Sequence, residues 1–458
     1  MPNNINYFKN LNGCILDAQD ACQEEDTGPK DPADFSELTR RLEACRLKLP
    51  PLYQEVIYKE YVGSIDRFGE TGFNKILLRD PRREGEACIM LDIAQAILQH
   101  GEGYSKKATD AFQEVVSDLY DGFLSAEDRR DIKPPDLEVV APLVKWGNPR
   151  FGPYTWPVDC TINFGVRAAI VSLPPANAQH GILAWAALSH ETAGHDIIHA
   201  DTGLLQEMKS CLLYAMQDAN IMPPLPDYWA ARIDETAADV LGILNMGPAV
   251  GIALIGYLRA LNAAYSGSSI LRNIGRGEDS HPADILRGYL ASSVVRLLNF
   301  SRANEWALAI EAETDKDMTT IQLGSDNTVI MPDDAKRSAG IVAGCLSQTK
   351  MICLNNHALG DIQNWSDNDE YLVKQIRSVL RTTDPLPELF NKGFYAAHVV
   401  AAAITEALFG DSDNSDIPLL FARMISALKM LHDKNPSWGP LYVRHPGNVV
   451  PLKAYIHV

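Results

Sequence analysis

Apolar residues recur every three to four positions over much of this chain, which is the period that places them on one face of an α-helix. The pattern covers residues 36–47, 88–99, 105–123, 204–217, 227–245, 393–408 and 417–431. Proline-rich stretches at 49–52 and 222–226 interrupt it, because proline cannot continue a helix. The pattern therefore predicts a mostly helical protein.

Two segments have the pattern of strands instead. Residues 165–173 are short, apolar and rich in β-branched side chains, and they stop at Pro174 and Pro175. Residues 319–331 contain two strand-like runs around a Gly-Ser-Asp-Asn turn that begins at Gly324. We predict an α+β fold that is mostly helical, with a short β-sheet.

The same pattern divides the chain into three regions. Residues 1–135 form a helical N-terminal region, 136–310 a core that contains the predicted strand and several helices, and 311–458 a helical C-terminal region. A chain of 458 residues with 46% hydrophobic side chains is long enough to bury a sizeable core.

Charge and cysteine usage exclude several classes of protein. The net charge of −18 argues against binding to nucleic acid or to an anionic membrane surface. No secretory signal and no apolar run of membrane-spanning length is visible. The eight cysteines include no CxxC pair, which is typical of reduced thiols. We expect a soluble cytoplasmic protein.

The sequence HETAGHDIIHAD, residues 190–201, carries the strongest chemical signal. It places three histidines and three carboxylates directly after the apolar run 181–188. Glu191, His195 and His199 are four residues apart, so on a continuous helix they share one face. Two histidines at this spacing are a common way to bind a transition metal.

Two later stretches have the composition that such a site needs. The sequence DETAADVLG at 234–242 places Glu235 and Asp239 on one face of a predicted helix. The sequence EDSHPADILR at 278–287 is a polar turn that opens another helix.

Together, these three stretches resemble the gluzincin class of zinc metallopeptidases over roughly residues 160–290. In that class an HExxH helix supplies two histidine ligands and a general-base glutamate, and a second helix with ExxxD or ExxAD supplies the third ligand. The heat-shock and CAAX-processing membrane proteases add a later His-Pro and Arg turn. The resemblance implies a zincin-like core, with Glu235 as third ligand, Asp239 as partner of a histidine ligand, and His281 and Arg287 in the later turn.

The resemblance also implies a place for the substrate. In this class the strand before the metal helix is an edge on which an extended substrate pairs. Ala169 and Val171, in the predicted strand, would serve that purpose.

The first motif departs from the family, because no HExxH is present, and two arrangements remain open. In the one we favour, His195 and His199 bind the metal and Asp196 replaces the usual glutamate as base. Glu191, one turn before His195, is then a further ligand or the base.

In the second arrangement, His190 and His195 are the ligands and Glu191 is the base. These histidines are five residues apart and would point about 140° apart on a regular helix, so this arrangement invokes a π-bulge near 192–194. His195 belongs to both arrangements.

The expected function is zinc-dependent hydrolysis of a peptide or other amide bond, with another first-row divalent metal as a possible substitute for zinc. Zinc binds imidazole and carboxylate and activates a water molecule, a carboxylate accepts its proton, and His281 or Arg287 stabilises the oxyanion. The flanking helical regions favour a short peptide or a modified small molecule as substrate.

Two other functions remain open. One is a non-catalytic relative, in which the altered motif belongs to a binding or scaffold protein. The other is an HD-domain metal phosphohydrolase, whose His-Asp doublet would be His195 and Asp196, with His100 and either Asp239 or Asp284 as further ligands. A catalytic site needs one carboxylate close to the metal-bound water but not on the metal.

Overall fold

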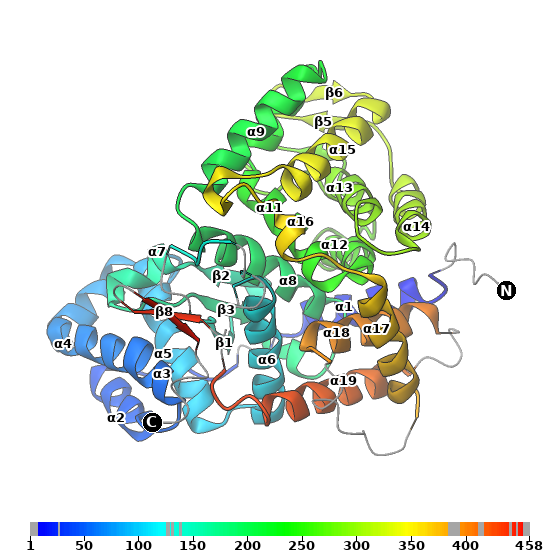
Figure 1. Ribbon diagram of the computed structural model, residues 1–458. Helices are drawn as coiled ribbons and strands as arrows, with labels where there is room; N and C mark the ends of the chain where they lie inside the picture. The colour runs from blue at the N-terminus through cyan, green and yellow to red at the C-terminus, as the bar shows by residue number, and fades with distance from the viewer. Residues whose placement is uncertain are drawn as a thin grey trace.

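The computed structural model describes residues 8–25, 28–124, 129, 132–136, 140–382, 394–410 and 416–438, and the backbone of 442–445 and 448–451. These residues form many helices and three small sheets, which confirms the predicted mostly helical α+β class. In Figure 1 a broad lower body contains the N-terminal helices and the first sheet, and a narrower upper lobe contains the helices around α9 and α15.

Each range that the apolar period predicts as helical contains a helix, although residues 227–245 hold two, and further helices lie outside the predicted ranges. The N-terminal helices are α1 (Leu11–Gln23), α2 (Phe35–Cys45), α3 (Pro51–Tyr53), α4 (Glu60–Arg79), α5 (Glu86–Glu102) and α6 (Lys106–Leu124). The central helices are α7 (Val158–Thr161), α8 (Ala184–His195), α9 (Leu204–Asp218), α10 (Leu225–Ala230), α11 (Ile233–Met246), α12 (Pro248–Ser266), α13 (Asp284–Arg296) and α14 (Ala303–Asp315). The C-terminal helices are α15 (Pro332–Gln348), α16 (Leu359–Ile362), α17 (Asp367–Leu380), α18 (Ala396–Phe409) and α19 (Ile417–His432).

The first sheet has the strand order β1-β3-β2, with β1 at Leu143–Trp146, β2 at Tyr154–Trp156 and β3 at Ile170–Leu173. Strand β3 pairs parallel with β1 and antiparallel with β2, so Val171 faces Val144 on one side and Thr155 on the other.

The prediction that Ala169 and Val171 offer a free edge is therefore wrong. Strand β3 is the central strand, and its continuous apolar run reflects burial on both faces. The Ala169 carbonyl, just before the strand, accepts a hydrogen bond from the Leu143 N–H. The edge strand on the side of α8 is β2.

The second sheet contains β4 (Ile274–Gly275), β5 (Ile321–Leu323) and β6 (Thr328–Ile330), and the third contains β7 (Tyr442–His445) and β8 (Asn448–Pro451). Strands β5 and β6 pair antiparallel, which confirms the strand pair predicted around Gly324. Gly324 has a φ of 75°, a conformation that glycine adopts without strain.

Two hydrophobic cores lie on opposite faces of the first sheet. Val144 and Val171 point into the larger core, which takes residues from all three predicted regions. Leu143 and Ile170 point into the smaller core, formed with α2, α4 and α5. Among the described helices, none combines the length and apolar character that crossing a bilayer requires.

Helices α8 and α11 pack closely against each other through small residues. A Cβ placed on Gly194 would lie 1.9 Å from the Ala238 Cβ, and one placed on Gly242 would lie 3.2 Å from the Ser189 carbonyl carbon. Small residues at these positions let the two backbones approach, which places the HETAGH sequence directly against the helix of Glu235 and Asp239.

We predict that Gly194→Ala lowers the free energy of unfolding by about 1–3 kcal/mol, because the added methyl group must push α8 away from α11. The matched control is Gly340→Ala in α15, where an added Cβ meets nothing within 4 Å. That change should stabilise the protein by about 0.5–1 kcal/mol through helix propensity. Urea denaturation measures both, and equal effects of the two substitutions would contradict the proposed close packing.

Candidate metal centre

The helix that carries the first motif ends earlier than predicted. Helix α8 stops at His195, Asp196 has non-helical backbone angles, and residues Ile197–Ala200 form a short 3-10 turn. The prediction that Glu191, His195 and His199 share one continuous helical face is therefore wrong. The chain is anchored just after this turn by Asp201, which forms a fully buried ion pair with Arg129 at 2.8 Å.

The structure brings His190, His195 and Glu235 together. One ligand atom from each of the three lies within 4.8 Å of the other two. The Glu235 Oε2 atom is 3.2 Å from His190 Nε2, and its Oε1 atom is 3.6 Å from His195 Nε2. This is the histidine pair of the second arrangement, although α8 remains α-helical to His195 and contains no π-bulge.

His199 lies outside this group of three, so the favoured pair of His195 and His199 is not the one that converges on Glu235. Its Nε2 atom is 3.4 Å from Asp234 Oδ1, while the other oxygen of Asp234 is 3.7 Å from His195 Nδ1. The end of α8 at His195 separates the two histidines, because the following turn carries His199 to the flank of Asp234.

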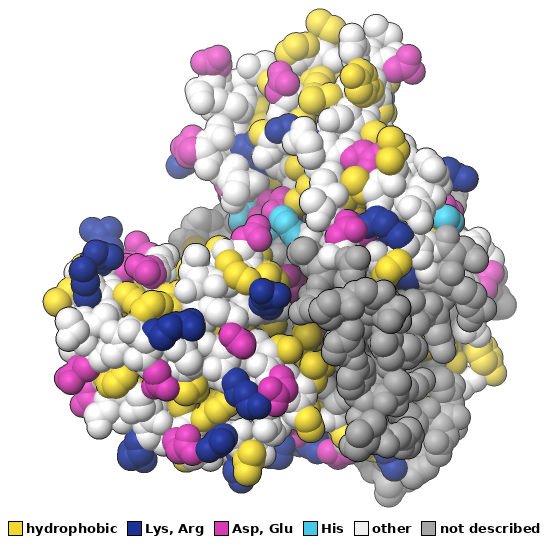
Figure 2. Space-filling view, turned by 60° about the vertical axis from the view of Figure 1, so that its left-hand side comes forward, with side chains coloured by type: hydrophobic (Ala, Val, Ile, Leu, Met, Phe, Trp, Pro, Cys, Tyr) yellow, Lys and Arg dark blue, Asp and Glu magenta, His cyan; other side chains and the backbone are white. Residues whose placement is uncertain are grey.

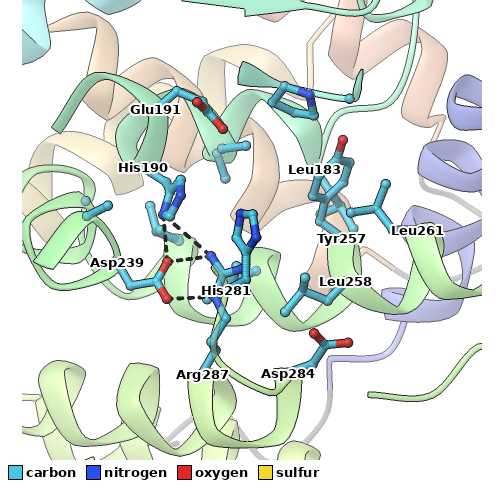
Figure 3. Close-up of a pocket in the computed structure, with 18 of the residues that line it drawn as sticks. Leu183, His190, Glu191, Asp239, Tyr257, Leu258, Leu261, His281, Asp284 and Arg287 are labelled. Carbon is cyan, nitrogen blue, oxygen red and sulfur yellow. Dashed lines mark hydrogen bonds and ion pairs between the residues drawn. The ribbon is translucent and has the colours of Figure 1, made fainter. Parts of the chain in front are cut away.

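Asp239 and Arg287 form a buried support for His190. The His190 Nδ1 atom is 2.8 Å from Asp239 Oδ1, and the Arg287 guanidinium donates two hydrogen bonds of 2.8 Å to the same carboxylate (Figure 3). A carboxylate on the far nitrogen of a metal-binding histidine fixes the ring and leaves the other nitrogen for the metal. Asp239 is thus the partner of a histidine in the group, as the resemblance implies, whereas Arg287 pairs with Asp239 from within α13.

Glu191 and His281 line a cavity of about 370 Å³ beside this group. Figure 3 shows Glu191 at one side of the cavity and His281 reaching in from the loop before α13. The His281 Nε2 atom is 3.3 Å from Glu235 Oε2, and the side chain keeps 45% of its surface exposed. The Thr155 hydroxyl lies 3.0 Å from both the carboxylate Oε2 atom and the backbone carbonyl oxygen of Glu191, and these two acceptors share its single proton.

Asp196, the alternative base, lies elsewhere. Its side chain is buried, it is absent from the cavity wall, and its Oδ2 atom has no hydrogen-bond partner in the described part of the chain. Burial raises the pKa of Asp196 to about 7. The geometry thus favours Glu191 over Asp196 for access to the cavity.

Two residues near the site have no counterpart in the sequence analysis. Asp234 faces both His195 and His199, and burial opposes ionisation while hydrogen bonds to these histidines hold its pKa well below the usual range. In the sequence, the indication for Asp234 was its position directly before Glu235. Thr155, on β2, orients Glu191 from 36 residues away, and no local pattern could have indicated that contact.

The electrostatics of the group favour a cation. Burial lowers the pKa of His190, but the Asp239 and Glu235 carboxylates outweigh burial and raise it to about 10. The neighbouring histidines hold the pKa of Glu235 at about 2 despite its burial. The buried Glu235 Oε2 atom has no hydrogen bond within the described residues. Two imidazoles and an ionised carboxylate form a ligand set that suits zinc.

The group of His190, His195 and Glu235 lies where the upper lobe meets the lower body. Figure 2 shows histidine and acidic side chains gathered in the waist between the upper lobe and the lower body. The Glu191 and His190 side chains are nonetheless buried, with 7% and 8% of their surfaces exposed. A substrate would therefore reach the group through the cavity.

Comparisons of the chain with protein families, with curated proteins and with solved structures found no match. The interpretation of this site therefore depends on its own geometry, donor set and electrostatics.

We predict that the purified protein binds about one zinc ion per chain, in line with a single three-ligand site. His190→Ala, His195→Ala and Glu235→Ala should each abolish binding at micromolar zinc. His199→Ala is the matched control and should retain it, since His199 lies outside the ligand group. Metal analysis after gel filtration measures this, and loss in His199→Ala with retention in His190→Ala would reverse the assignment.

Zinc affinity should rise with pH. His190 carries a proton at pH 7 because its pKa is raised to about 10, and the metal must displace that proton. The pKa of His195 is raised as well, and this second ligand must also be neutral to bind the metal. Binding should therefore release at least about one proton at pH 7, and the dissociation constant should fall by at least about tenfold per pH unit between pH 6 and 8. Calorimetry in buffers of different ionisation enthalpy measures the released proton. An affinity independent of pH would contradict His190 as a ligand.

Proposed function

We propose that this protein is a zinc-dependent hydrolase with a zincin-like core that cleaves a peptide or other amide bond. The observation that carries this proposal is the relation of Glu191 to the group of His190, His195 and Glu235. Glu191 lines the same cavity as His190, a member of the group, but does not itself belong to the group. A hydrolytic site needs such a carboxylate, close to the attacking water yet off the metal.

The chain's own residues supply the remaining steps. Bound zinc would lower the pKa of a water molecule and polarise the carbonyl of the substrate. Glu191, whose carboxylate lies 3.0 Å from the Thr155 hydroxyl, would accept the proton of the attacking water and deliver it to the leaving amine. His281, at the rim of the group, donates a hydrogen bond to the developing oxyanion. Asp239 and Arg287 keep the His190 ring oriented.

The position of the substrate follows from the edge strand and the cavity. Strand β2 lies at the edge of its sheet, and its central residue Thr155 contacts Glu191. An extended peptide paired with β2 would place its carbonyl near the metal group. The adjoining cavity is mostly apolar, with walls that include Leu183, Val250, Leu254, Leu258 and Leu261. We infer a preference for a bulky apolar side chain next to the cleaved bond.

Polar residues at the other end of the cavity do not alter this preference. Asp284 is fully buried there, but Arg272 and Asn262 donate hydrogen bonds to its carboxylate at 2.7–2.9 Å. Its charge is therefore balanced within the wall, and a charged substrate side chain would find no unpaired partner in Asp284.

The other candidate functions receive less support. The HD-domain interpretation needs Asp196 and His100 at the metal, but neither belongs to the group, and His100 packs against Trp438 with ring centroids 4.8 Å apart. A scaffold protein would not need a carboxylate at the position of Glu191 in the cavity. We place the activity in the cytoplasm, because all eight cysteines are free thiols and no pair of them forms a disulfide.

We predict that Glu191→Gln lowers kcat by about 10²–10⁴-fold while one zinc per chain is retained, because the amide cannot accept a proton. Asp196→Asn is the matched control and should change kcat little, since Asp196 does not line the cavity. Cleavage of a peptide mixture with apolar residues, followed by mass spectrometry, measures both.

Three results would argue against this function. Full activity in Glu191→Gln would exclude Glu191 as the base, and loss confined to Asp196→Asn would assign that function to Asp196. A zinc-loaded wild-type protein that cleaves none of the peptides would favour the scaffold alternative.

A further inference from the structure

A second cavity, of about 240 Å³, lies on the opposite face of the first sheet from the metal group. Helix α5 forms one wall, the end of β1 and Tyr154 of β2 form another, and the loops at Pro29–Asp31 and Arg82–Arg83 form the mouth. Unlike the first cavity, its lining is mainly polar. It shares only the Phe151 side chain with the cavity beside the metal group.

Lys145, on β1, is a buried cation with an unused donor. Only 3% of the residue is exposed. Its ammonium nitrogen donates to Asp92 Oδ1 at 2.5 Å and to the Tyr154 hydroxyl at 2.9 Å. An ammonium group has three N–H donors, so one of them has no partner among the described residues.

Gln95, on α5, is a buried amide with an unused acceptor. It is 3% exposed, and its Nε2 atom donates to Asp31 Oδ1 at 3.0 Å and to the Pro29 carbonyl at 3.4 Å. These two acceptors determine which end of the amide carries the nitrogen. The Oε1 atom then has no hydrogen-bond partner in the described part of the chain.

The mouth of the cavity is positively charged. Within the lining, Arg83 pairs with Asp31 and Lys145 pairs with Asp92. Lys30 and Arg82 also line the cavity, and neither has a carboxylate partner in the described residues. Counted over the described residues, the lining thus carries two positive charges without a carboxylate partner, in a chain whose net charge is −18.

We propose that this second cavity binds phosphate that retains an O–H group, either as free hydrogen phosphate or as the monoanion of a small monoester. The ligand must offer anionic oxygens to Lys145 and Arg82 and a hydrogen-bond donor to Gln95 Oε1. Hydrogen phosphate carries both in one compact group, and lysine and arginine are the usual side chains that bind it. The volume leaves room for a further small substituent on the phosphate.

Calorimetric titration of the full chain with inorganic phosphate at pH 6.5 tests this proposal, with sulfate as the matched probe. Sulfate has a similar size and a larger negative charge but no O–H donor at this pH, so charge alone would favour sulfate. We expect phosphate to bind at least about tenfold more tightly than sulfate, because only phosphate satisfies Gln95 Oε1. Gln95→Leu should bring the two affinities together.

The charge requirement is tested by a double variant, Lys30→Glu with Arg82→Glu. It should weaken phosphate binding by at least about tenfold, since it replaces two attractive charges with repulsive ones. The matched control is Lys75→Glu, an exposed residue of α4 outside the cavity, which should bind phosphate as the wild type does.

Three outcomes would overturn the proposal. The first is no binding of phosphate at millimolar concentration, which would mean that the cavity holds only water. The second is equal binding of sulfate and phosphate by the wild type. The third is binding of N-acetylglycine, a carboxylate with an adjacent N–H, in preference to phosphate. The readout needs neither zinc nor turnover, so failure here is distinct from failure of the proposed hydrolase.

Discussion

The close contact between α8 and α11 is the constraint on which the candidate metal centre depends. Gly194 meets Ala238, and Gly242 meets Ser189, so the two helix backbones approach more closely than larger side chains would allow. At this distance Glu235 reaches both His190 and His195, and Asp239 reaches the far nitrogen of His190. The ligand group is therefore a product of helix packing, and its geometry is as rigid as the core around it.

Buried charge then determines what the site can hold. Asp234 and Glu235 lie in the first turn of α11 and Asp239 one turn later. The three carboxylates surround two histidines, with Arg287 as the balancing cation of Asp239. Without a metal, protons must neutralise these carboxylates, which is why the pKa of His190 is raised to about 10. A divalent cation would take the place of these protons and bind the same side chains more strongly. The second cavity has an excess of positively charged side chains instead, and so suits an anion.

The edge strand β2 connects the two faces of the sheet. Thr155 points toward α8 and holds Glu191. Its neighbours Tyr154 and Trp156 point the other way, and both donate hydrogen bonds to Asp92 of α5, at 2.7 and 2.8 Å. The strand that orients the proposed base is thereby anchored from behind by a buried carboxylate, which is itself paired with Lys145.

The sequence by itself determined several of the helices, the strand pair near Gly324 and the residue types of the site, because these follow from the local apolar period and from motifs a few residues long. Glu235, Asp239 and Arg287 could be found in this way. The tertiary structure alone decided where α8 ends, which strand is the edge, and that Asp234 and Thr155 adjoin the site. Those outcomes depend on contacts between distant residues, such as the buried pair of Arg129 and Asp201 and the pairing of β3 on both sides, and no local pattern encodes them.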